Sequence, residues 1–327
     1  MYLKQGWLSP AYVTTDKSGK ITNISNQHSA EVNEEINGFA ITPITNSHSH
    51  AFQYGMAGLT ENIPQGQGHD NFWSWRDRMY RLADQINPDQ MESIAKMLYA
   101  EMLRAGYNHV VEFHYLRNDE KGNNYTNPNE MSDRLISAAL KVGMKITLVP
   151  VYYRCSDFGK EPSEAQKRFQ FSSTESYFKH IESLSSTYAS NTEVTIGYGL
   201  HSLRIATANE IKEIISYNLE LPCHLHISEQ MKEVDACVQY LGARPVEWLT
   251  TETEVGSNCH LVHSTHITND EMNAIIRTDA NVVICPTTEG NLGDGFFPIS
   301  DYIKANGRWC IGSDSHINLN PFEEVRL

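Results

Sequence analysis

Histidines and one aspartate stand at the ends of four apolar runs of this chain, where they could bind a metal ion together. His48 and His50, in the tetrapeptide SHSH, are two residues apart, so on a strand both imidazoles project to one face. Imidazole and carboxylate ligands suit Zn²⁺, and Fe²⁺ or Mn²⁺ accept the same ligand types. Taken alone, the HxH pair is as compatible with core or surface histidines as with a metal site.

Three further runs end in candidate residues. His226 is the better third ligand in CHLHIS, because His224 lies one layer deeper and is expected to be a hydrogen-bonded core residue. Glu229 follows at the mouth, where it could move protons or simply favour the first turn of the next helix. His263 ends the sixth run, and Asp314 follows the eighth, where a turn residue would also serve. Their joint occurrence at strand ends favours one shared site.

One metal ion is expected rather than two. A two-metal site would need a bridging ligand, such as a carbamylated lysine, on a middle strand, and the run KITLVPVYY offers only Lys145, at its wrong end. A single catalytic zinc keeps an open position for water, whose pKa it lowers towards about 7.

Two arginines could bind an anionic substrate. Arg76 lies in the aromatic, loop-like segment FWSWRDRMYR, and Arg204 follows the fourth run in GLHSLR. Guanidinium groups bind carboxylates in a bidentate manner, so two of them predict a substrate with two carboxylates. On the sequence alone, surface salt bridges explain both residues more simply.

Eight apolar runs alternate with helical patterns from about residue 40 onwards. Near-continuous apolar runs are typical of strands buried on both faces, and βα alternation predicts a parallel sheet. Eight such units favour an α/β fold of the closed (β/α)₈, TIM-like type, whose site lies at the carboxyl ends of the strands. No GxGxxG motif follows the first run, which weakens a dinucleotide-binding fold. The runs are GFAITPITN, NHVVEFHY, KITLVPVYY, EVTIGYGL, PCHLHIS, CHLVHS, NVVICPTT and RWCIGSD.

The first 40 residues differ from the rest and predict a small β-unit, with two short strands around the turn DKSGK. The expected domains are therefore this unit, 1–40, and the barrel, 41–327.

Composition restricts the partners and the compartment. The net charge of −14, from 40 acidic and 26 basic residues, argues against a nucleic-acid or anionic-membrane partner. Six cysteines without a CxxC motif indicate reduced thiols, and no apolar stretch is long enough for a membrane span or a signal peptide. A cytoplasmic protein is expected.

Several segments resemble the amidohydrolase superfamily and, within it, the N-formimino-L-glutamate deiminases of histidine degradation. The resemblance covers residues 46–316 in the segments NSHSHAFQYGMAGLTE, FWSWRDRMY, VVEFHYL, GLHSLR, HLHISEQ, LVHSTH, PTTEGNLGDGFFP and GSDSH. It implies a hydrolase that converts N-formimino-L-glutamate, a small dicarboxylate amidine, to N-formyl-L-glutamate and ammonia.

The resemblance also implies residue roles. One zinc ion would be bound by His48, His50, His226 and Asp314. His263 and Asp314 would orient the attacking water, and Glu229 would carry its proton to the departing nitrogen.

The substrate side follows from the same resemblance. Arg76 and Arg204 would hold the two carboxylates, with Gln53, Tyr115 and His201 as further contacts.

Family members continue beyond the eighth strand and complete a small β-sandwich with their N-terminal strands. This chain ends at Leu327, 13 residues after Asp314 (327 − 314 = 13), so we expect a partial sandwich and a barrel truncated after its eighth strand. Apolar faces would then be left exposed on both units, which would put their stability and the formation of a possible homodimer in doubt. Two alternatives stay open: a deaminase acting on an aromatic base or another amidine, which would not need two arginines, and a truncated, non-catalytic remnant.

Overall fold

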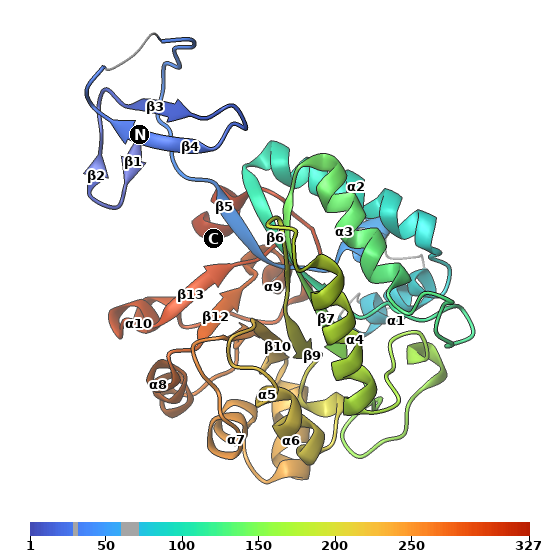
Figure 1. Ribbon diagram of the computed structural model, residues 1–327. Coiled ribbons are helices and arrows are strands. Elements are labelled where there is room, and N and C mark those ends of the chain that lie inside the picture. The colour runs from blue at the N-terminus through green and yellow to red at the C-terminus, as the bar shows by residue number, and fades with distance from the viewer. Residues whose placement is uncertain (29–31, 60–71) are drawn as a thin grey trace. The chain divides into compact units, whose positions relative to one another are not determined.

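The computed structural model describes residues 1–28, 32–59 and 72–327. These residues form two compact units, Met1–Ile44 and Thr45–Leu327, and Figure 1 shows the elements of each. Thr60 and Glu61, which end the first family-like segment, lie outside the described residues.

The first unit contains two antiparallel hairpins, β1 (Tyr2–Leu3) with β2 (Gly6–Trp7), and β3 (Tyr12–Thr15) with β4 (Ile21–Ser25). The second hairpin confirms the pair of strands predicted around DKSGK. Asp16 stabilises its turn, because its Oδ1 accepts hydrogen bonds from the backbone N–H of Ser18 at 2.8 Å and of Lys20 at 3.0 Å.

The second unit is the predicted eight-position (β/α)₈ barrel. Hydrogen-bonded neighbours follow the chain order, and every pair from β6 to β13 is parallel. The strands are β5 (Ile44–Ser49), β6 (Tyr107–His114), β7 (Lys145–Tyr152), β8 (Val194–Ile196), β9 (Tyr198–Leu200), β10 (Cys223–Ile227), β11 (Cys259–His263), β12 (Asn281–Ile284) and β13 (Arg308–Ile311).

The barrel closes where the chain leaves its first and last strands. Ser49 and Asp314 form a parallel bridge, and the backbone N–H of Asp314 donates to the carbonyl of His48 at 3.0 Å. The Asn46 amide adds a second link, since its Nδ2 donates to Ser313 Oγ at 2.7 Å and its Oδ1 accepts from the Ser313 N–H at 3.0 Å. The closure therefore brings the HxH segment next to Asp314.

One barrel position is divided between two short strands. The run EVTIGYGL supplies β8, which pairs with β7, and β9, which pairs with β7 and β10. Gly197 lies at the break, where a Cβ atom would come within 2.8 Å of the Pro222 carbonyl oxygen. Glycine is needed there because the two backbones approach closely.

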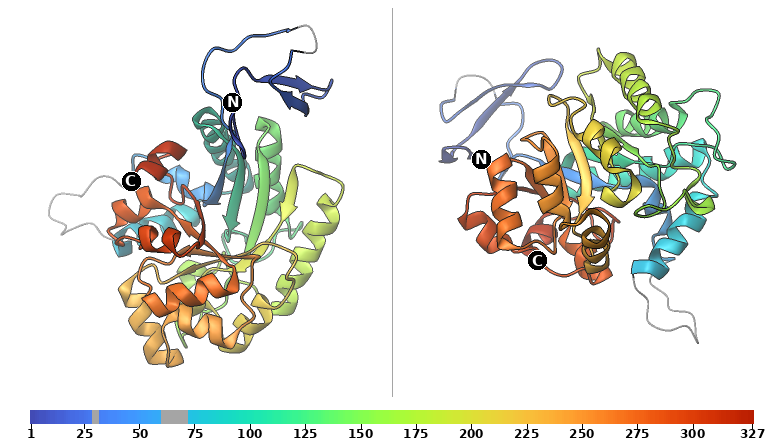
Figure 2. Two further views of the ribbon diagram at one scale, coloured as in Figure 1. Left: turned by 90° about the vertical axis from the view of Figure 1, so that its left-hand side faces the viewer. Right: turned by 90° about the horizontal axis from the view of Figure 1, so that it is seen from below.

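Helices surround the strands of the barrel, as Figures 1 and 2 show. Most match the predicted helical stretches, with N-caps such as Asn87, Ser173, Thr207 and Thr268. The helices are α1 (Phe72–Ala83), α2 (Pro88–Ala105), α3 (Glu130–Val142), α4 (Thr174–Tyr188), α5 (Ala208–Ile215), α6 (Met231–Leu241), α7 (Pro245–Glu252), α8 (Asn269–Thr278), α9 (Pro286–Leu292), α10 (Ile299–Lys304) and α11 (Pro321–Arg326).

Helix α1 corrects one expectation, because the segment around Arg76 was predicted to be a loop. Met79 and Ala83, four residues apart, are buried on one face of this helix, and that packing outweighs the polar character of its sequence.

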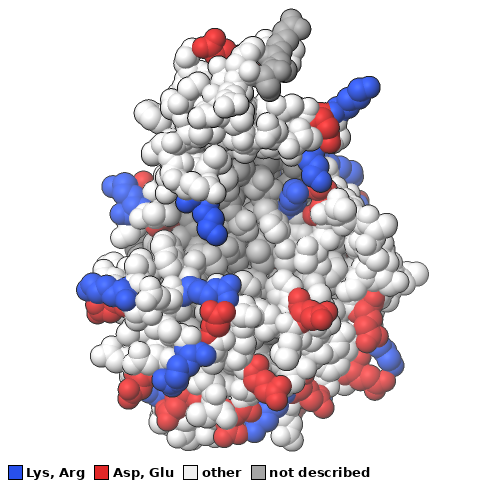
Figure 3. Space-filling view, turned by 60° about the vertical axis from the view of Figure 1, so that its left-hand side comes forward, with Lys and Arg blue, Asp and Glu red and all other residues white. Residues whose placement is uncertain are grey.

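Basic side chains lie singly or beside acidic ones on the face drawn in Figure 3. Within the described ranges, none of the helices combines the length and the apolar character that crossing a bilayer requires. All six cysteines are free thiols, and Cys223, Cys237, Cys259 and Cys285 are buried.

Candidate active site

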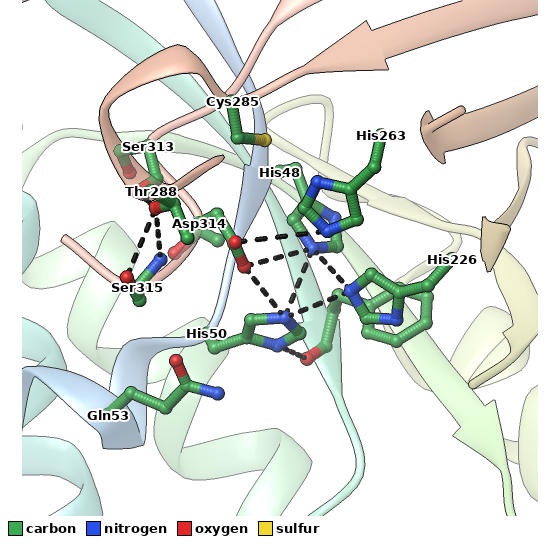
Figure 4. Close-up of polar contacts among 12 residues, drawn as sticks. His48, His50, Gln53, His226, His263, Cys285, Thr288, Ser313, Asp314 and Ser315 are labelled. Atoms are coloured by element: carbon green, nitrogen blue, oxygen red, sulfur yellow. Dashed lines mark hydrogen bonds and ion pairs between the residues drawn. The ribbon is translucent and has the colours of Figure 1, made fainter. Parts of the chain in front are cut away.

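Three imidazoles and one carboxylate meet at the carboxyl ends of the barrel strands (Figure 4). The Nε2 atom of His48 lies 3.0 Å from that of His50 and 3.0 Å from that of His226, and the last two are 3.3 Å apart. Asp314 Oδ1 lies 3.2 Å from His50 Nε2 and 3.5 Å from His48 Nε2. All four residues are buried.

The hydrogen bonds on the far side of two rings show which nitrogen faces the centre with a lone pair. His50 Nδ1 lies 3.1 Å from the Phe113 carbonyl oxygen, and His226 Nδ1 lies 3.0 Å from the His201 carbonyl oxygen. A carbonyl only accepts, so each Nδ1 carries a proton, and in the neutral ring the Nε2 then keeps the lone pair with which it could bind a metal ion. Lone pairs and a carboxylate directed at one point repel one another unless a cation lies between them.

The spacing fits a metal ion. Two nitrogens bound at about 2.0–2.1 Å to one ion, at angles of about 90–110°, are separated by about 2.9–3.4 Å. The three separations between the Nε2 atoms of His48, His50 and His226 fall in this range. These residues and Asp314 therefore form a buried site that could hold a metal ion.

The protonation states also suit metal ligands, which must be deprotonated. Burial lowers the pKa of His48 to about 4 and holds that of His226 well below its ordinary value. Burial opposes ionisation of Asp314, but the neighbouring rings of His48 and His50 outweigh it and keep its pKa well below the ordinary value. Neutral His48 and His226 and an ionised Asp314 result.

The backbone is strained at or just after the ends of strands β10, β11 and β13, beside the site. Ser228, His263 and Asp314 have φ angles of 53°, 69° and 47°, in the left-handed region that non-glycine residues rarely adopt. Such conformations persist where the surrounding structure holds them, and they gather at functional sites.

Glu112, on β6, holds the HxH segment in place. Its carboxylate accepts hydrogen bonds from Ser49 Oγ at 2.7 Å and from the Ala51 N–H at 2.6 Å, on either side of His50. The Tyr99 hydroxyl donates a third, at 3.1 Å. Burial raises the pKa of Glu112 to about 7, although these donors favour its ionised form. This residue was not predicted from the sequence, in which the available signal was a lone acid inside the apolar run VVEFHY.

Glu289, on α9, is a second residue that the sequence analysis did not assign. Its Oε1 lies 3.1 Å from His263 Nδ1 and also accepts from the Cys285 N–H at 2.8 Å. His263 Nε2 lies 3.7 Å from Glu229 Oε1 and 3.9 Å from Asp314 Oδ2. Burial disfavours a charged His263, but the carboxylates of Glu229, Glu289 and Asp314 outweigh it and raise its pKa above the ordinary value.

Glu229 is buried at the same cavity as His263. Burial raises its pKa, while the positive charges of His263 and Arg204 act in the opposite direction. The Glu229 and Ser228 N–H groups donate to the carboxylate of Glu233, at 3.1 and 3.3 Å, which fixes the backbone at this strand end.

The cavity beside the four possible ligands is narrow, with a free volume of about 40 Å³. That volume has room for only a few water molecules. Arg76 and Arg204 are the basic side chains of its lining, which also includes Tyr80 and Tyr153. Burial opposes the charge of Arg204, but the nearby acids, first Glu233, raise its pKa.

Aromatic and amide groups complete the lining. Gln53 Nε2 donates to the Tyr115 hydroxyl at 3.0 Å, and the buried Gln53 Oε1 has no partner among residues 1–28, 32–59 and 72–327. The Arg76 guanidinium carbon lies 5.7 Å from the centre of the Tyr80 ring. The His201 ring packs 4.8 Å from that of His226, measured between centroids.

A family model described as "Amidohydrolase family" matches residues 40–327. The chain belongs to this family. A formimidoylglutamate deiminase from Pseudomonas aeruginosa is 40% identical over 326 residues, which are 99% of this chain and 71% of that protein. A 5-methylthioadenosine/S-adenosylhomocysteine deaminase from Lawsonia intracellularis is 22% identical, over 86% of this chain and 58% of that protein.

The solved structures agree with this assignment. The crystal structure of an amidohydrolase from Brucella melitensis superimposes with a TM-score of 0.94 at 38% identity, over 99% of this chain and 72% of that one. The resemblance to the amidohydrolases that the sequence indicated is therefore confirmed.

In this amidohydrolase, the side chains that the sequence singled out come together. All of the proposed catalytic, substrate-binding and metal-binding residues except His48 line the narrow cavity. His48 lies directly against His50 and His226. His224, one layer deeper, is buried as expected, but its ring stacks on that of His260 at 4.2 Å and its Nδ1 has no hydrogen-bond partner. The lining residues expected from the sequence are His50, Gln53, Arg76, Tyr115, His201, Arg204, His226, Glu229, His263 and Asp314.

Proposed function

We propose that this amidohydrolase hydrolyses N-formimino-L-glutamate to N-formyl-L-glutamate and ammonia, with one zinc ion held by His48, His50, His226 and Asp314. The similarity to the formimidoylglutamate deiminase supports the substrate. The observation that carries the proposal is the presence of two arginines, Arg76 and Arg204, in the cavity beside the four possible ligands. A buried site with two guanidinium groups fits a substrate with two carboxylates.

The proposed roles follow from position. Arg76 and Arg204 hold the carboxylates, which restricts the motion of the substrate and directs its formimino group towards the metal ligands. Gln53 Oε1, which lacks a partner, accepts a hydrogen bond from an N–H of the substrate. Tyr115 and His201 contact the substrate from the same wall.

The reaction requires an activated water and a proton transfer. Zinc, when bound at an open coordination site, lowers the pKa of water enough to supply a nucleophile at neutral pH. Glu229, whose pKa burial raises, accepts one proton of the water as its oxygen bonds to the formimino carbon, and gives this proton to the terminal nitrogen. It then passes the remaining hydroxyl proton of the tetrahedral carbon to the same nitrogen. The bond between this carbon and the terminal nitrogen breaks, ammonia leaves, and the carbon keeps the oxygen of the water as the formyl group.

His263 stabilises the charge that develops at the attacked carbon. Its Nδ1 is held by Glu289, so its Nε2 is directed towards Asp314 and Glu229. A protonated imidazole in this position donates a hydrogen bond to developing negative charge.

The arginines provide the test. We expect Arg76→Met and Arg204→Met each to lower kcat/KM for N-formimino-L-glutamate by about 10–100-fold, the effect of a lost hydrogen bond to a charged group. With N-formiminoglycine, which has one carboxylate, one of the two substitutions should have a much smaller effect. Arg308→Met, whose guanidinium pairs with Asp279 outside the cavity lining, is the control and should keep full activity.

Ammonia release is the readout, beside zinc content. Zinc-loaded wild-type protein that releases no ammonia from N-formimino-L-glutamate would contradict the proposal. Ammonia release from 5-methylthioadenosine that neither arginine substitution changes would instead favour a base deaminase.

A further inference from the structure

A second and larger cavity, of about 610 Å³, lies outside the candidate active site. Its walls come from the segments that follow β6 and β7 and from the first turns of α4. The two cavities share no described lining residue. One short segment contributes to both, because Phe169 lines the narrow cavity and Gln170 and Phe171 line this one.

The charge of the lining is positive. Arg117, Arg154 and Lys179 belong to it, and none of its residues is acidic, in a chain whose net charge is −14. Glu210 and Glu175, the acidic neighbours of Arg154 and Lys179, are not part of the lining. Such a cavity attracts anions.

Within the part of the chain that the structure describes, Arg117 has only uncharged partners for its hydrogen bonds. Its guanidinium donates to the side-chain oxygens of Asn118 and Asn124, at 2.7 and 2.8 Å, and to the carbonyl of Gln170 at 2.9 Å. Its Nε is buried without an acceptor among the described residues, and its guanidinium carbon lies 3.9 Å from the centre of the Phe171 ring. Burial lowers the pKa of Arg117 only to about 10, so the group remains charged at neutral pH without a carboxylate to balance it.

His180 supplies an independent sign of a ligand. It lines the cavity from α4 with only 6% of its surface exposed, and neither of its ring nitrogens has a hydrogen-bond partner among the described residues. Asn129, another buried lining residue, has a side-chain oxygen without a partner. Buried polar atoms in native proteins are nearly always hydrogen-bonded, so these groups indicate a missing partner.

We propose that this cavity is a second small-molecule site, which binds an oxyanion-bearing ligand, a phosphate or a carboxylate compound. Arg117, Arg154 and Lys179 bind the oxyanion, and His180 donates a ring N–H to the ligand. Asn129 Oδ1 accepts a hydrogen bond from a polar group elsewhere on the same molecule. The site is independent of the proposed deiminase reaction, since none of these residues lines the narrow cavity.

Isothermal titration of the zinc-loaded protein tests the proposal, with inorganic phosphate and acetate, a monocarboxylate that cannot occupy both Arg76 and Arg204, as separate probes at constant ionic strength. We expect at least one probe to bind, and the double substitution Arg154→Met with Lys179→Met to weaken it by about tenfold or more. Binding of phosphate alone assigns a phosphate compound, and binding of acetate alone assigns a carboxylate. Both side chains are largely exposed, at 45% and 70%, so the fold should tolerate their replacement.

Two controls separate this site from other effects. Lys160→Met with Lys304→Met removes the same charge from exposed positions outside the lining and should leave binding unchanged. Arg204→Met, in the narrow cavity, should also leave it unchanged. His180→Phe keeps the ring but removes its nitrogens, and it should weaken binding without lowering Tm. The proposal is overturned if neither probe binds below about 10 mM, if both double variants lose affinity equally, or if Arg204→Met abolishes binding.

Discussion

Glu289 Oε1 lies 3.1 Å from Nδ1 of His263, and the same oxygen accepts a hydrogen bond from the N–H of Cys285. The carboxylate therefore joins the start of α9 to the histidine at the end of β11. Because Nδ1 is bound in this way, the orientation of the ring and the charge of His263 both depend on Glu289.

Glu289→Gln tests this dependence. The amide oxygen can still accept the two hydrogen bonds, but the negative charge that favours a protonated His263 is lost. We expect kcat for N-formimino-L-glutamate to fall by about 10–100-fold, with little change in Tm or zinc content. Glu289→Ala should lower Tm as well, because it leaves the His263 and Cys285 donors unpaired in a buried place. A Gln variant with unchanged kcat across the pH range would show that the charge is not needed.

Metal binding should depend on His226 and not on His224, two residues earlier on the same strand. His226 faces the other ligands, whereas His224 stacks on His260 in the barrel interior. We expect His226→Ala to hold less than half an equivalent of zinc by elemental analysis, and His224→Asn to retain about one equivalent in its folded fraction. An Ala variant that kept a full equivalent of zinc would contradict the ligand assignment.

Removal of the metal should also lower stability. Without a cation, the Nε2 atoms of His50 and His226 and the Asp314 carboxylate remain directed at one another. A ligand that binds only the folded state stabilises it by about 4 kcal/mol when present at 1,000 times its Kd. We therefore expect a chelator to lower Tm of the wild-type protein, zinc to restore it, and neither to change Tm of the His226→Ala variant.

The sequence predicted the barrel and the residues at its strand ends because both depend on local patterns. Each run is apolar over a strand's length, and His48, His50, His226 and Asp314 occupy the ends that a parallel barrel brings together. The family resemblance then singled out Arg76 and Arg204, which chemical type alone did not distinguish from surface arginines.

The supporting carboxylates could not be predicted, since their partners are distant in sequence. Glu112 binds groups that lie 61 and 63 residues away, and Glu289 binds a histidine 26 residues away. Helices α1 and α7 were missed for a related reason: they become helical through the apolar residues that they bury, such as Met79 and Leu249. Helix α9, also missed, buries Thr288 and Glu289 instead, and Glu289 accepts a hydrogen bond from the Cys285 N–H at its start.

Gly312 should be essential for the closure of the barrel. A Cβ atom at this position would come within 2.6 Å of the His48 Cβ and 2.9 Å of the His48 N. We expect Gly312→Ala to lower the free energy of unfolding by about 1–3 kcal/mol and to weaken zinc binding, because His48 must shift. Gly290→Ala is the control: its Cβ would meet nothing within 4 Å on helix α9, so stability should be unchanged or rise by up to about 1 kcal/mol. Equal effects of the two substitutions in denaturant unfolding would argue against a specific contact with His48.

Glu324, on α11, should make stability depend on pH. Burial raises its pKa to about 7, although its carboxylate accepts hydrogen bonds from the N–H and hydroxyl of Thr287. The folded protein then binds this proton more tightly than the unfolded chain, whose glutamates have a pKa of about 4.3. By linkage, the buried charge does not lower the free energy of unfolding below about pH 4.5. Its destabilising effect grows as the pH rises and is complete above about pH 7.

Glu324→Gln removes that cost, so the Tm of the variant relative to wild type should be higher at pH 8 than at pH 5. The lost hydrogen bond of the substituted amide lowers Tm at both values and cancels in the comparison. Glu323→Gln is the matched control, because its pKa is lowered by a hydrogen bond with Arg326 and its relative Tm should change little, or in the opposite direction. A relative Tm of the Glu324 variant that stays constant from pH 5 to pH 8 would mean that this carboxyl titrates alike in the folded and unfolded chain, despite its burial.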